Sequence, residues 1–121
     1  MKILVCGGSG FIGSTFIRNY LQNHAKTQIT NLDNLTIGSN QENLKDLQNN
    51  SAYKFIKEDI RNETFIENLV KDFDIVINFA AESHVDRSIA NPKPFIETNI
   101  LGTYSLLESI RKHDKLFVHI S

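Results

Sequence analysis

Four glycines near the N-terminus have the spacing of a phosphate-binding loop. Residues 7–13 read GGSGFIG, in which Gly7 or Gly8 begins a glycine pattern that continues at Gly10 and Gly13. The loop follows a short apolar run and precedes a segment with helical spacing, which is the context in which this pattern marks a dinucleotide site. Glycine allows a sharp turn and a close approach of the backbone to a diphosphate, and the following helix N-terminus offers N–H groups to the phosphates. A tight turn without a ligand is the alternative, but such a turn needs fewer glycines.

Two aspartates follow the next two apolar segments. Asp33 stands 20 residues after Gly13, where a carboxylate accepts hydrogen bonds from the adenosine ribose hydroxyls of a dinucleotide. Residues 27–44 contain no Lys or Arg that would neutralise a 2′-phosphate, so we predict a preference for NAD over NADP. A solvated loop aspartate is the alternative for Asp33. Asp59 could meet the adenine through the adjacent backbone, and a helix-capping role suits it equally well.

A polar run follows the fourth apolar segment. Residues 80–89 read AAESHVDRSI, and the ligands of doubly wound sheets bind beyond the carboxyl ends of the strands. These side chains are therefore placed to contact a ligand, although a helix-capping loop with internal ion pairs would have the same composition. His84, His113 and His119 lack metal-ligand spacing, so we predict no metal site.

The segments that must position these residues alternate between strand and helix patterns. Short runs rich in Ile, Val and Phe indicate strands at residues 3–6, 28–33, 53–58, 74–80 and 116–120. Helical spacing follows the glycines, recurs at 41–49 and after Asn62, and extends from Pro92 through about His113. Strands joined by crossover helices are parallel, so we predict an α/β fold: a doubly wound, Rossmann-type parallel sheet of five strands with four helical connections. The buried side of the long helix is expected to carry Phe95, Ile96, Leu106, Leu107 and Ile110.

The composition argues against several other classes of protein. The 121 residues carry 13 Lys and Arg against 14 Asp and Glu, so the chain lacks the basic surface of a nucleic-acid-binding protein. No apolar run approaches the ~20 residues that span a bilayer, and the N-terminus lacks the pattern of a signal peptide. The single cysteine, Cys6, cannot form an internal disulfide, which favours a cytoplasmic protein. We expect one dinucleotide-binding domain over residues 1–121.

Four segments together resemble one family of enzymes. They are GGSGFIG at 7–13, DNLT at 33–36, AAESHVDRSI at 80–89 and FIETNILGTYSLLE at 95–108. The chain is similar to the N-terminal part of NDP-sugar 4,6-dehydratases of the dTDP-glucose type, within the extended short-chain dehydrogenase/reductase family. The resemblance implies NAD as cofactor, a nucleotide-sugar substrate, a homodimer, and no nucleic-acid or membrane partner. It implies a lyase reaction in which the sugar is oxidised at C4, loses water across C5–C6 and regains the hydride at C6.

The resemblance also implies roles for individual residues. It assigns the diphosphate to Gly7, Gly10, Phe11, Ile12 and Gly13; the adenosine ribose to Asp33, Asn34, Leu35 and Thr36; the adenine to Asp59 and Ile60; the nicotinamide side to Phe79, Ala80, Ala81 and Glu82; a further cofactor contact to Thr98; and a substrate contact to Ser83. Asn99 resembles the asparagine that organises the active site in this superfamily.

The family's proton-moving groups are a Tyr-x-x-x-Lys pair and a Thr-Asp-Glu run. Only Tyr53 has a lysine four residues later, Lys57, and because this pair lies on a predicted strand we regard it as a coincidence. The resemblance ends at Ser121, just before the Thr-Asp-Glu run, so we expect no catalytic residue here and no activity from this chain alone. An open strand edge at 116–120 and the long helix lead us to expect self-association. A stand-alone NAD-binding module and the front part of another extended-family epimerase or dehydratase are the alternatives.

Overall fold

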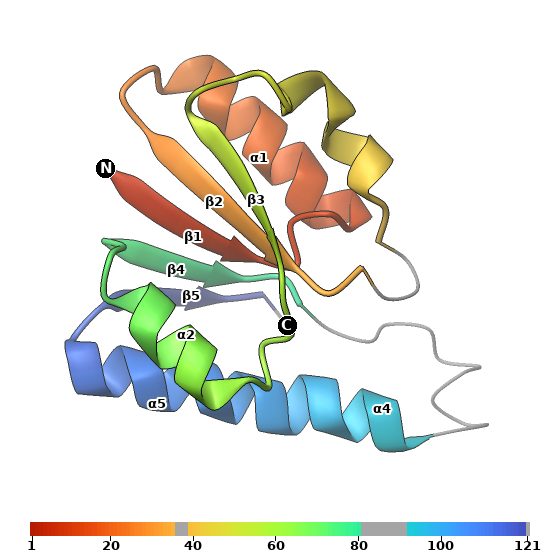
Figure 1. Ribbon diagram of the computed structural model, residues 1–121, viewed down its shortest axis with the longest axis vertical. Helices are drawn as coiled ribbons and strands as arrows, with labels where there is room; N and C mark the ends of the chain where they lie inside the picture. Colours follow the sequence, from red (N-terminus) through yellow and green to blue (C-terminus); the bar gives the residue numbers. More distant parts are fainter. Residues whose placement is uncertain (36–38, 81–91, 121) are drawn as a thin grey trace.

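Five parallel strands form a single sheet in the computed structural model, which describes residues 1–35, 39–80 and 92–120. The strand order is β3-β2-β1-β4-β5 (Figure 1). The strands are β1 (Lys2–Cys6), β2 (Gln28–Asp33), β3 (Tyr53–Lys57), β4 (Ile75–Asn78) and β5 (Leu116–His119). The prediction of a doubly wound parallel sheet is confirmed, and every strand lies within two residues of its predicted bounds.

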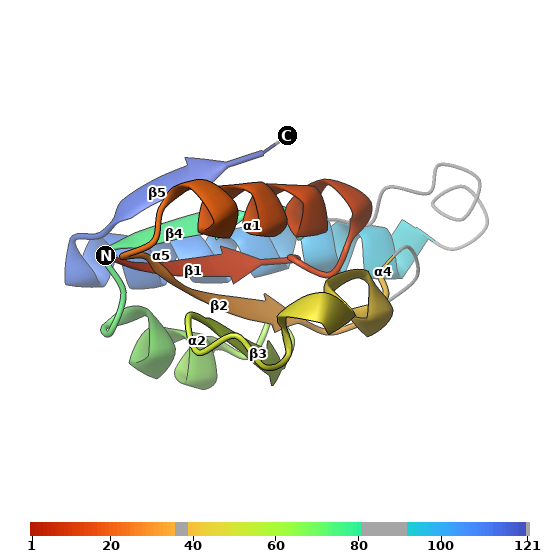
Figure 2. The ribbon, with the colours of Figure 1, turned by 90° about the horizontal axis from the view of Figure 1, so that it is seen from above.

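Helices connect each strand to the next, as predicted. They are α1 (Phe11–Asn23), the 3₁₀-helix η1 (Gln41–Leu47), α2 (Glu63–Val70), and a continuous run of α4 (Pro92–Ile96), the π-helical η2 (Glu97–Gly102) and α5 (Thr103–His113). In Figure 1, α1 and η1 lie on one side of the sheet and α2 and α5 on the other. Figure 2 looks from the α1 side, with α1 in front of the strands and α5 behind them.

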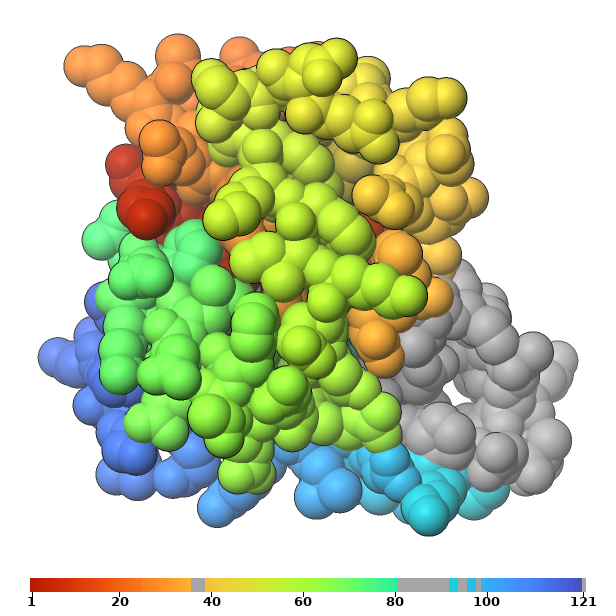
Figure 3. Space-filling view, in the orientation of Figure 1, coloured from red at the N-terminus to blue at the C-terminus, as the bar shows by residue number. Residues whose placement is uncertain are grey.

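Side chains of the central strand alternate between two cores, one on each face of the sheet. Ile3 and Val5 pack toward α1 and η1, whereas Leu4 and Cys6 pack toward α2 and α5. All four are at most 1% exposed. Figure 3 shows the segments of β3 and α2 across the middle of the face seen in Figure 1. Burial, together with the charge of Asp33, raises the pKa of the Cys6 thiol to about 12, so the thiol stays protonated and unreactive.

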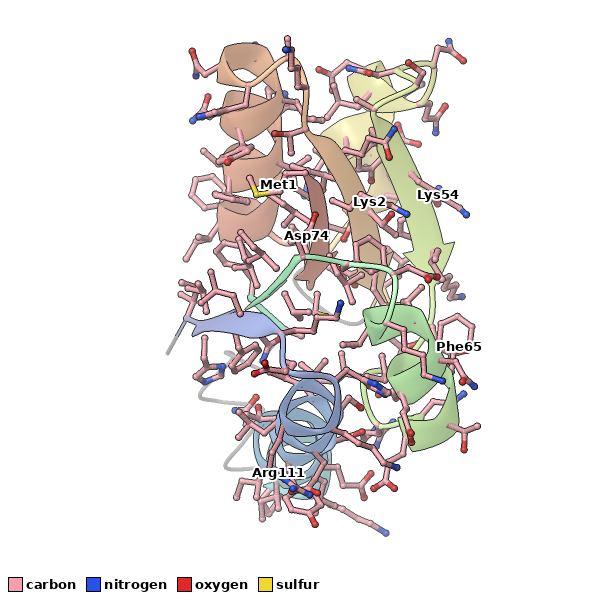
Figure 4. All side chains as sticks on the ribbon, turned by 90° about the vertical axis from the view of Figure 1, so that its left-hand side faces the viewer. Met1, Lys2, Lys54, Phe65, Asp74 and Arg111 are labelled. Atoms are coloured by element: carbon pink, nitrogen blue, oxygen red, sulfur yellow. The ribbon has the colours of Figure 1, made fainter. Side chains whose placement is uncertain are left out.

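The strands all begin at one end of the sheet, here called the amino edge, and all finish at the opposite end, the carboxyl edge. At the amino edge the backbone N–H of Lys2 donates to Asp74 Oδ2 at 2.8 Å, which ties the starts of β1 and β4 together (Figure 4). At the carboxyl edge β4 ends at Asn78 rather than at residue 80, because the Asn78 side-chain oxygen accepts the Ala80 N–H at 2.9 Å and turns the chain. The glycine loop lies at this carboxyl edge, after β1.

One prediction about the long helix is wrong in part. Leu106 and Ile110 are buried as expected, but Ile96 and Leu107 are each 47% exposed. Leu106 and Ile110 are four residues apart and face α2, whereas Leu107 lies about 100° further round the helix. The side chain of Phe95 lies outside the described part of the chain. None of the helices in the described ranges combines the length and apolarity needed to cross a membrane.

Candidate dinucleotide-binding site

At two positions of the glycine loop, neighbouring backbone atoms leave no room for a side chain. Gly7 has a left-handed φ of 78°, and a Cβ there would lie 2.5 Å from the Ala80 nitrogen, on the segment that follows β4. A Cβ at Gly13 would lie 2.5 Å from the Gly7 carbonyl oxygen. Both neighbours are backbone atoms, so only glycine lets the loop fold back against the start of α1 and pack against β4.

The N-terminus of α1 presents backbone N–H groups at the end of this loop. Gly10 is the N-cap residue, with extended backbone (φ −75°, ψ 174°), and the first helical bond runs from Ser14 N–H to its carbonyl at 2.9 Å. Among the described residues no hydrogen bond takes the N–H groups of Phe11, Ile12 and Gly13, and the first turn holds no acidic side chain. The partial positive charge of the helix end is therefore available to an anion such as a diphosphate.

Asp33 ends β2 and directs its carboxylate at the glycine loop. Oδ2 accepts the Ser9 N–H at 2.8 Å, and Oδ1 accepts the Leu35 N–H at 2.7 Å. Leu35, the donor to Oδ1, has a left-handed φ of 56°. Asp33 is only 6% exposed, so the solvated-loop alternative is wrong. Each carboxylate oxygen has two lone pairs, so each keeps one acceptor position for a ligand hydroxyl.

Asp59 belongs to a set of polar contacts that crosses the carboxyl edge of the sheet. Its carboxylate accepts from Asn34 Nδ2 at 3.3 Å and from the Arg61 backbone N–H at 2.9 Å. The Arg61 guanidinium pairs with Asp59 on one side and with Glu97 of η2 on the other. Burial by itself would raise the pKa of Asp59, but the hydrogen bonds and charge of Arg61 outweigh it and hold that pKa below its usual value. Asp59 is therefore a fixed anion that joins the β2 and β3 loops to the long helix.

The helix-capping alternative for Asp59 is wrong. The N-cap residue of α2 is Asn62, and its Oδ1 accepts the Phe65 N–H at 3.4 Å. Ile60, the next residue after Asp59, is 5% exposed. Its side chain points into the core against Gly102, where a Cβ on the glycine would collide with it.

The remaining predicted site residues fall into two groups. Phe79 and Ala80 follow β4 and lie next to the glycine loop, since Phe79 N–H donates to the Cys6 carbonyl at 2.7 Å and Ala80 adjoins Gly7. Thr36, Ala81, Glu82 and Ser83 lie outside the described residues, as does the side chain of Thr98 on η2. Asn99 also lies on η2.

The lysine four residues after Tyr53 is not placed for joint chemistry with it. Residues four apart on a strand are separated by roughly 13 Å, whereas the same spacing on a helix would make them neighbours. The Tyr53 hydroxyl instead receives a hydrogen bond from Asn31 Nδ2 at 3.1 Å, and burial raises the pKa of this tyrosine. Within the described ranges, no three His, Cys, Asp or Glu side chains are grouped so that they could hold a metal ion.

The sequence did not predict the roles of two residues that shape the glycine loop. Ser9 supplies the N–H that holds Asp33, and Asn31 is a buried side chain that contacts the Ser9 hydroxyl. The available signal was an amide side chain between Ile29 and Leu32, in the middle of a predicted strand. That signal identifies an unusual strand residue, but it does not say which loop the side chain touches.

A family model and several curated proteins match this chain. The model described as GDP-mannose 4,6 dehydratase matches residues 4–121. The chain is 49% identical over 115 residues to a dTDP-glucose 4,6-dehydratase of Haemophilus influenzae, covering 93% of this chain and 34% of that protein. It is 40% identical over 121 residues to a Mycobacterium tuberculosis protein of the same name, covering 100% of this chain and 36% of that protein. The chain thus spans about a third of the length of these curated relatives.

Solved structures of related enzymes have the same architecture over this region. A Bacillus anthracis dTDP-glucose 4,6-dehydratase in complex with NAD superposes with a TM-score of 0.88 at 39% identity, covering 100% of this chain and 37% of that chain. A Thermotoga maritima UDP-glucose 4-epimerase with UDP-glucose superposes with a TM-score of 0.85 at 32% identity, covering 98% of this chain and 37% of that chain.

Proposed function

Because this chain belongs to the GDP-mannose 4,6-dehydratase family, we propose that it forms the NAD-binding part of a nucleotide-sugar dehydratase of the dTDP-glucose type. The observation that carries the proposal is the Asp33 carboxylate, which is fixed beside the glycine loop by the Ser9 and Leu35 N–H groups. The identity to dTDP-glucose 4,6-dehydratases reaches 49%, against 32% for the T. maritima epimerase, which favours a dehydratase over an epimerase.

In this proposal different residues at the carboxyl edge bind different parts of the dinucleotide. The backbone N–H groups at the start of α1 bind the diphosphate, and Asp33 with its neighbours binds the adenosine ribose. The Asp59–Ile60 segment borders the adenine. The segment 79–82 and Thr98 border the nicotinamide half, and Ser83 contacts the substrate.

The chemistry of the proposed reaction needs a redox cofactor and groups that move protons. NAD supplies oxidation at the sugar C4 and return of the hydride at C6, with loss of water across C5–C6 between them. The residues of this chain bind and orient the cofactor. Neither its Tyr53–Lys57 pair, separated along β3, nor its other two tyrosines provide the Tyr-x-x-x-Lys geometry. We therefore expect turnover to require proton-moving groups that this sequence does not contain. The cytoplasmic location expected from the sequence stays a prediction.

A ligand titration tests the proposed cofactor. The 121-residue chain is expected to bind NAD weakly, and NAD at 100 times its Kd should then stabilise the fold by about 2.7 kcal/mol. NADP should stabilise it less, because the Asp33 carboxylate repels a 2′-phosphate. Thermal unfolding at rising concentrations of each nucleotide measures both effects. No shift with NAD would contradict the proposal, and equal shifts would contradict the role of Asp33.

We also propose that the chain associates with itself, through the homodimer that the resemblance implies. The outer side of the long helix carries large apolar side chains that are 47–60% exposed, namely Ile96, Ile100, Leu101, Tyr104 and Leu107. β5 forms one edge of the sheet, with Leu116 and Val118 exposed. Exposed apolar stripes and open strand edges both favour association.

Light scattering across a concentration series tests this association. The mean mass should rise with concentration, and Ile100→Glu should reduce the rise because it puts a charge into the apolar stripe. Gln22→Glu adds the same charge to an exposed position of α1 and should leave the rise unchanged. A monomer at every concentration would refute the association.

A further inference from the structure

Every polar group of Ser9 is held by a different partner. Its N–H donates to Asp33 Oδ2 at 2.8 Å, and its hydroxyl receives Asn31 Nδ2 at 3.0 Å. Its carbonyl accepts the Asn40 N–H at 3.0 Å and Asn43 Nδ2 at 2.9 Å. The residue is 1% exposed, so the centre of the glycine loop is fixed from β2 on one side and from η1 on the other.

Burying the polar side chain of Asn31 costs free energy. It is completely buried in β2, and its strand neighbours in register are Val5 and Phe55. Burying an amide costs free energy unless its hydrogen bonds are made, and Asn31 Oδ1 has no partner among the described residues. An apolar side chain would fill the same place at a lower free-energy cost, so packing alone does not explain why this position holds an amide.

The contacts of Asn31 supply that reason. Its Nδ2 bonds the Ser9 hydroxyl at 3.0 Å and the Tyr53 hydroxyl at 3.1 Å. Both partners are hydroxyls that donate as well as accept, so the amide can hold them in either of its orientations. A Cβ on Gly8 would collide with the Asn31 side chain. Asn31 therefore lies directly beneath the glycine loop and two residues before Asp33 on the same face of the strand.

We propose that Asn31 and the Ser9 hydroxyl form a tether that positions the Ser9 N–H, and through it the Asp33 carboxylate, for the adenosine ribose of NAD. The inference rests on the proposed function, since it assigns positioning residues to the same site. Asp33 makes the contact with the ribose. Ser9 and Asn31 fix the direction in which the two carboxylate oxygens face, so that vicinal hydroxyls meet both of them.

Calorimetric titration of NAD and of 2′-deoxy-NAD into the 121-residue chain tests the tether. Wild type should prefer NAD, because the analogue that lacks the 2′-hydroxyl of the adenosine ribose has lost one group that would donate a hydrogen bond to Asp33. Ser9→Ala should weaken NAD binding about fivefold, the effect of one neutral hydrogen bond. It should also reduce the preference for NAD over the deoxy analogue, which a general loss of stability would not do. Asn31→Leu should have the same two effects.

Two further variants separate the tether from other roles. Tyr53→Phe removes the other partner of Asn31 and keeps Ser9, so NAD affinity should stay within about twofold of wild type. In an Asp33→Asn background, Ser9→Ala should have little further effect, because the tether acts through Asp33. If Asn31→Leu does not fold, Ser9→Ala and Tyr53→Phe decide the question by themselves.

The outcomes distinguish the two proposals. Wild type that binds neither nucleotide overturns the proposed function and the tether with it. Wild type that binds NAD, with Ser9→Ala binding and discriminating equally well, overturns the tether alone. Additive losses from Ser9→Ala and Asp33→Asn would also overturn it, since Ser9 would then act independently of Asp33.

Discussion

Replacing Gly13 with alanine is expected to weaken NAD binding by roughly 50- to 100-fold, or about 2–3 kcal/mol. The new Cβ would lie 2.5 Å from the Gly7 carbonyl oxygen and 2.8 Å from the Gly8 Cα. Both atoms belong to the backbone of the glycine loop, so the loop itself must move away from α1. That movement displaces the N–H groups proposed to bind the diphosphate. Calorimetric titration of NAD measures the loss.

Gly102 provides a matched control for this substitution. Gly102→Ala also adds one Cβ at a helical glycine, and both substitutions gain up to ~1 kcal/mol of helix propensity. The Cβ at Gly102 meets Cδ1 and Cγ1 of the buried Ile60 side chain, rather than the backbone of the loop. NAD affinity should therefore fall less in Gly102→Ala than in Gly13→Ala, because only Gly13→Ala displaces the N–H groups proposed to bind the diphosphate. Similar NAD affinity in Gly13→Ala and wild type would place the diphosphate away from this loop.

Asp33→Asn is expected to remove most of the discrimination between NAD and NADP. The amide has nearly the same shape as the carboxylate, but it has one acceptor oxygen in place of two. Either the Ser9 or the Leu35 N–H then loses its partner at a buried site, which costs about 1–3 kcal/mol of stability. NAD affinity should fall roughly 10-fold or more, because hydrogen bonds to a charged group are worth about 1.5–3 kcal/mol. NADP affinity should not fall with it, since the repulsion of a 2′-phosphate is gone.

Titration of both nucleotides into Asp33→Asn and wild type gives the ratio of the two Kd values. Asp72→Asn removes the same charge from an exposed residue just before β4, at the amino edge of the sheet, and should leave the ratio unchanged. A ratio in Asp33→Asn equal to that of wild type would show that discrimination arises elsewhere in the chain.

The sequence predicted most of the fold because the relevant signals are local. Apolar runs and helical spacing depend on residues within one or two turns of each other, and they placed all five strands and every connecting helix. They failed at the outer side of the long helix, where Leu106 and Leu107 are adjacent and equally apolar. Only the packing of α2 against α5 decides that Leu106 is buried and Leu107 half exposed.

The candidate site was predictable in position and not in its contacts. Counting residues from the glycines is enough to place Asp33 at the end of the second strand, near the loop. The sequence left open whether Asp59 caps a helix. In the structure Asn62 is the N-cap of α2, and Asp59 instead pairs with Arg61, which in turn pairs with Glu97, 36 residues after Arg61. An ion pair between residues so far apart in the sequence forms only when the fold brings them together, so no local sequence pattern predicts it.

By itself the sequence determined the sheet, the glycine loop at its carboxyl edge and an acidic residue at the end of the second strand, because each depends on residue type and spacing along one segment. The tertiary structure decided the direction of the Asp33 carboxylate. That direction is set by the Ser9 N–H, 24 residues away, and Ser9 is in turn held by Asn31 of β2 and by η1. Hydrogen bonds are directional and short, so the geometry of this site follows from how three segments pack and not from any one of them.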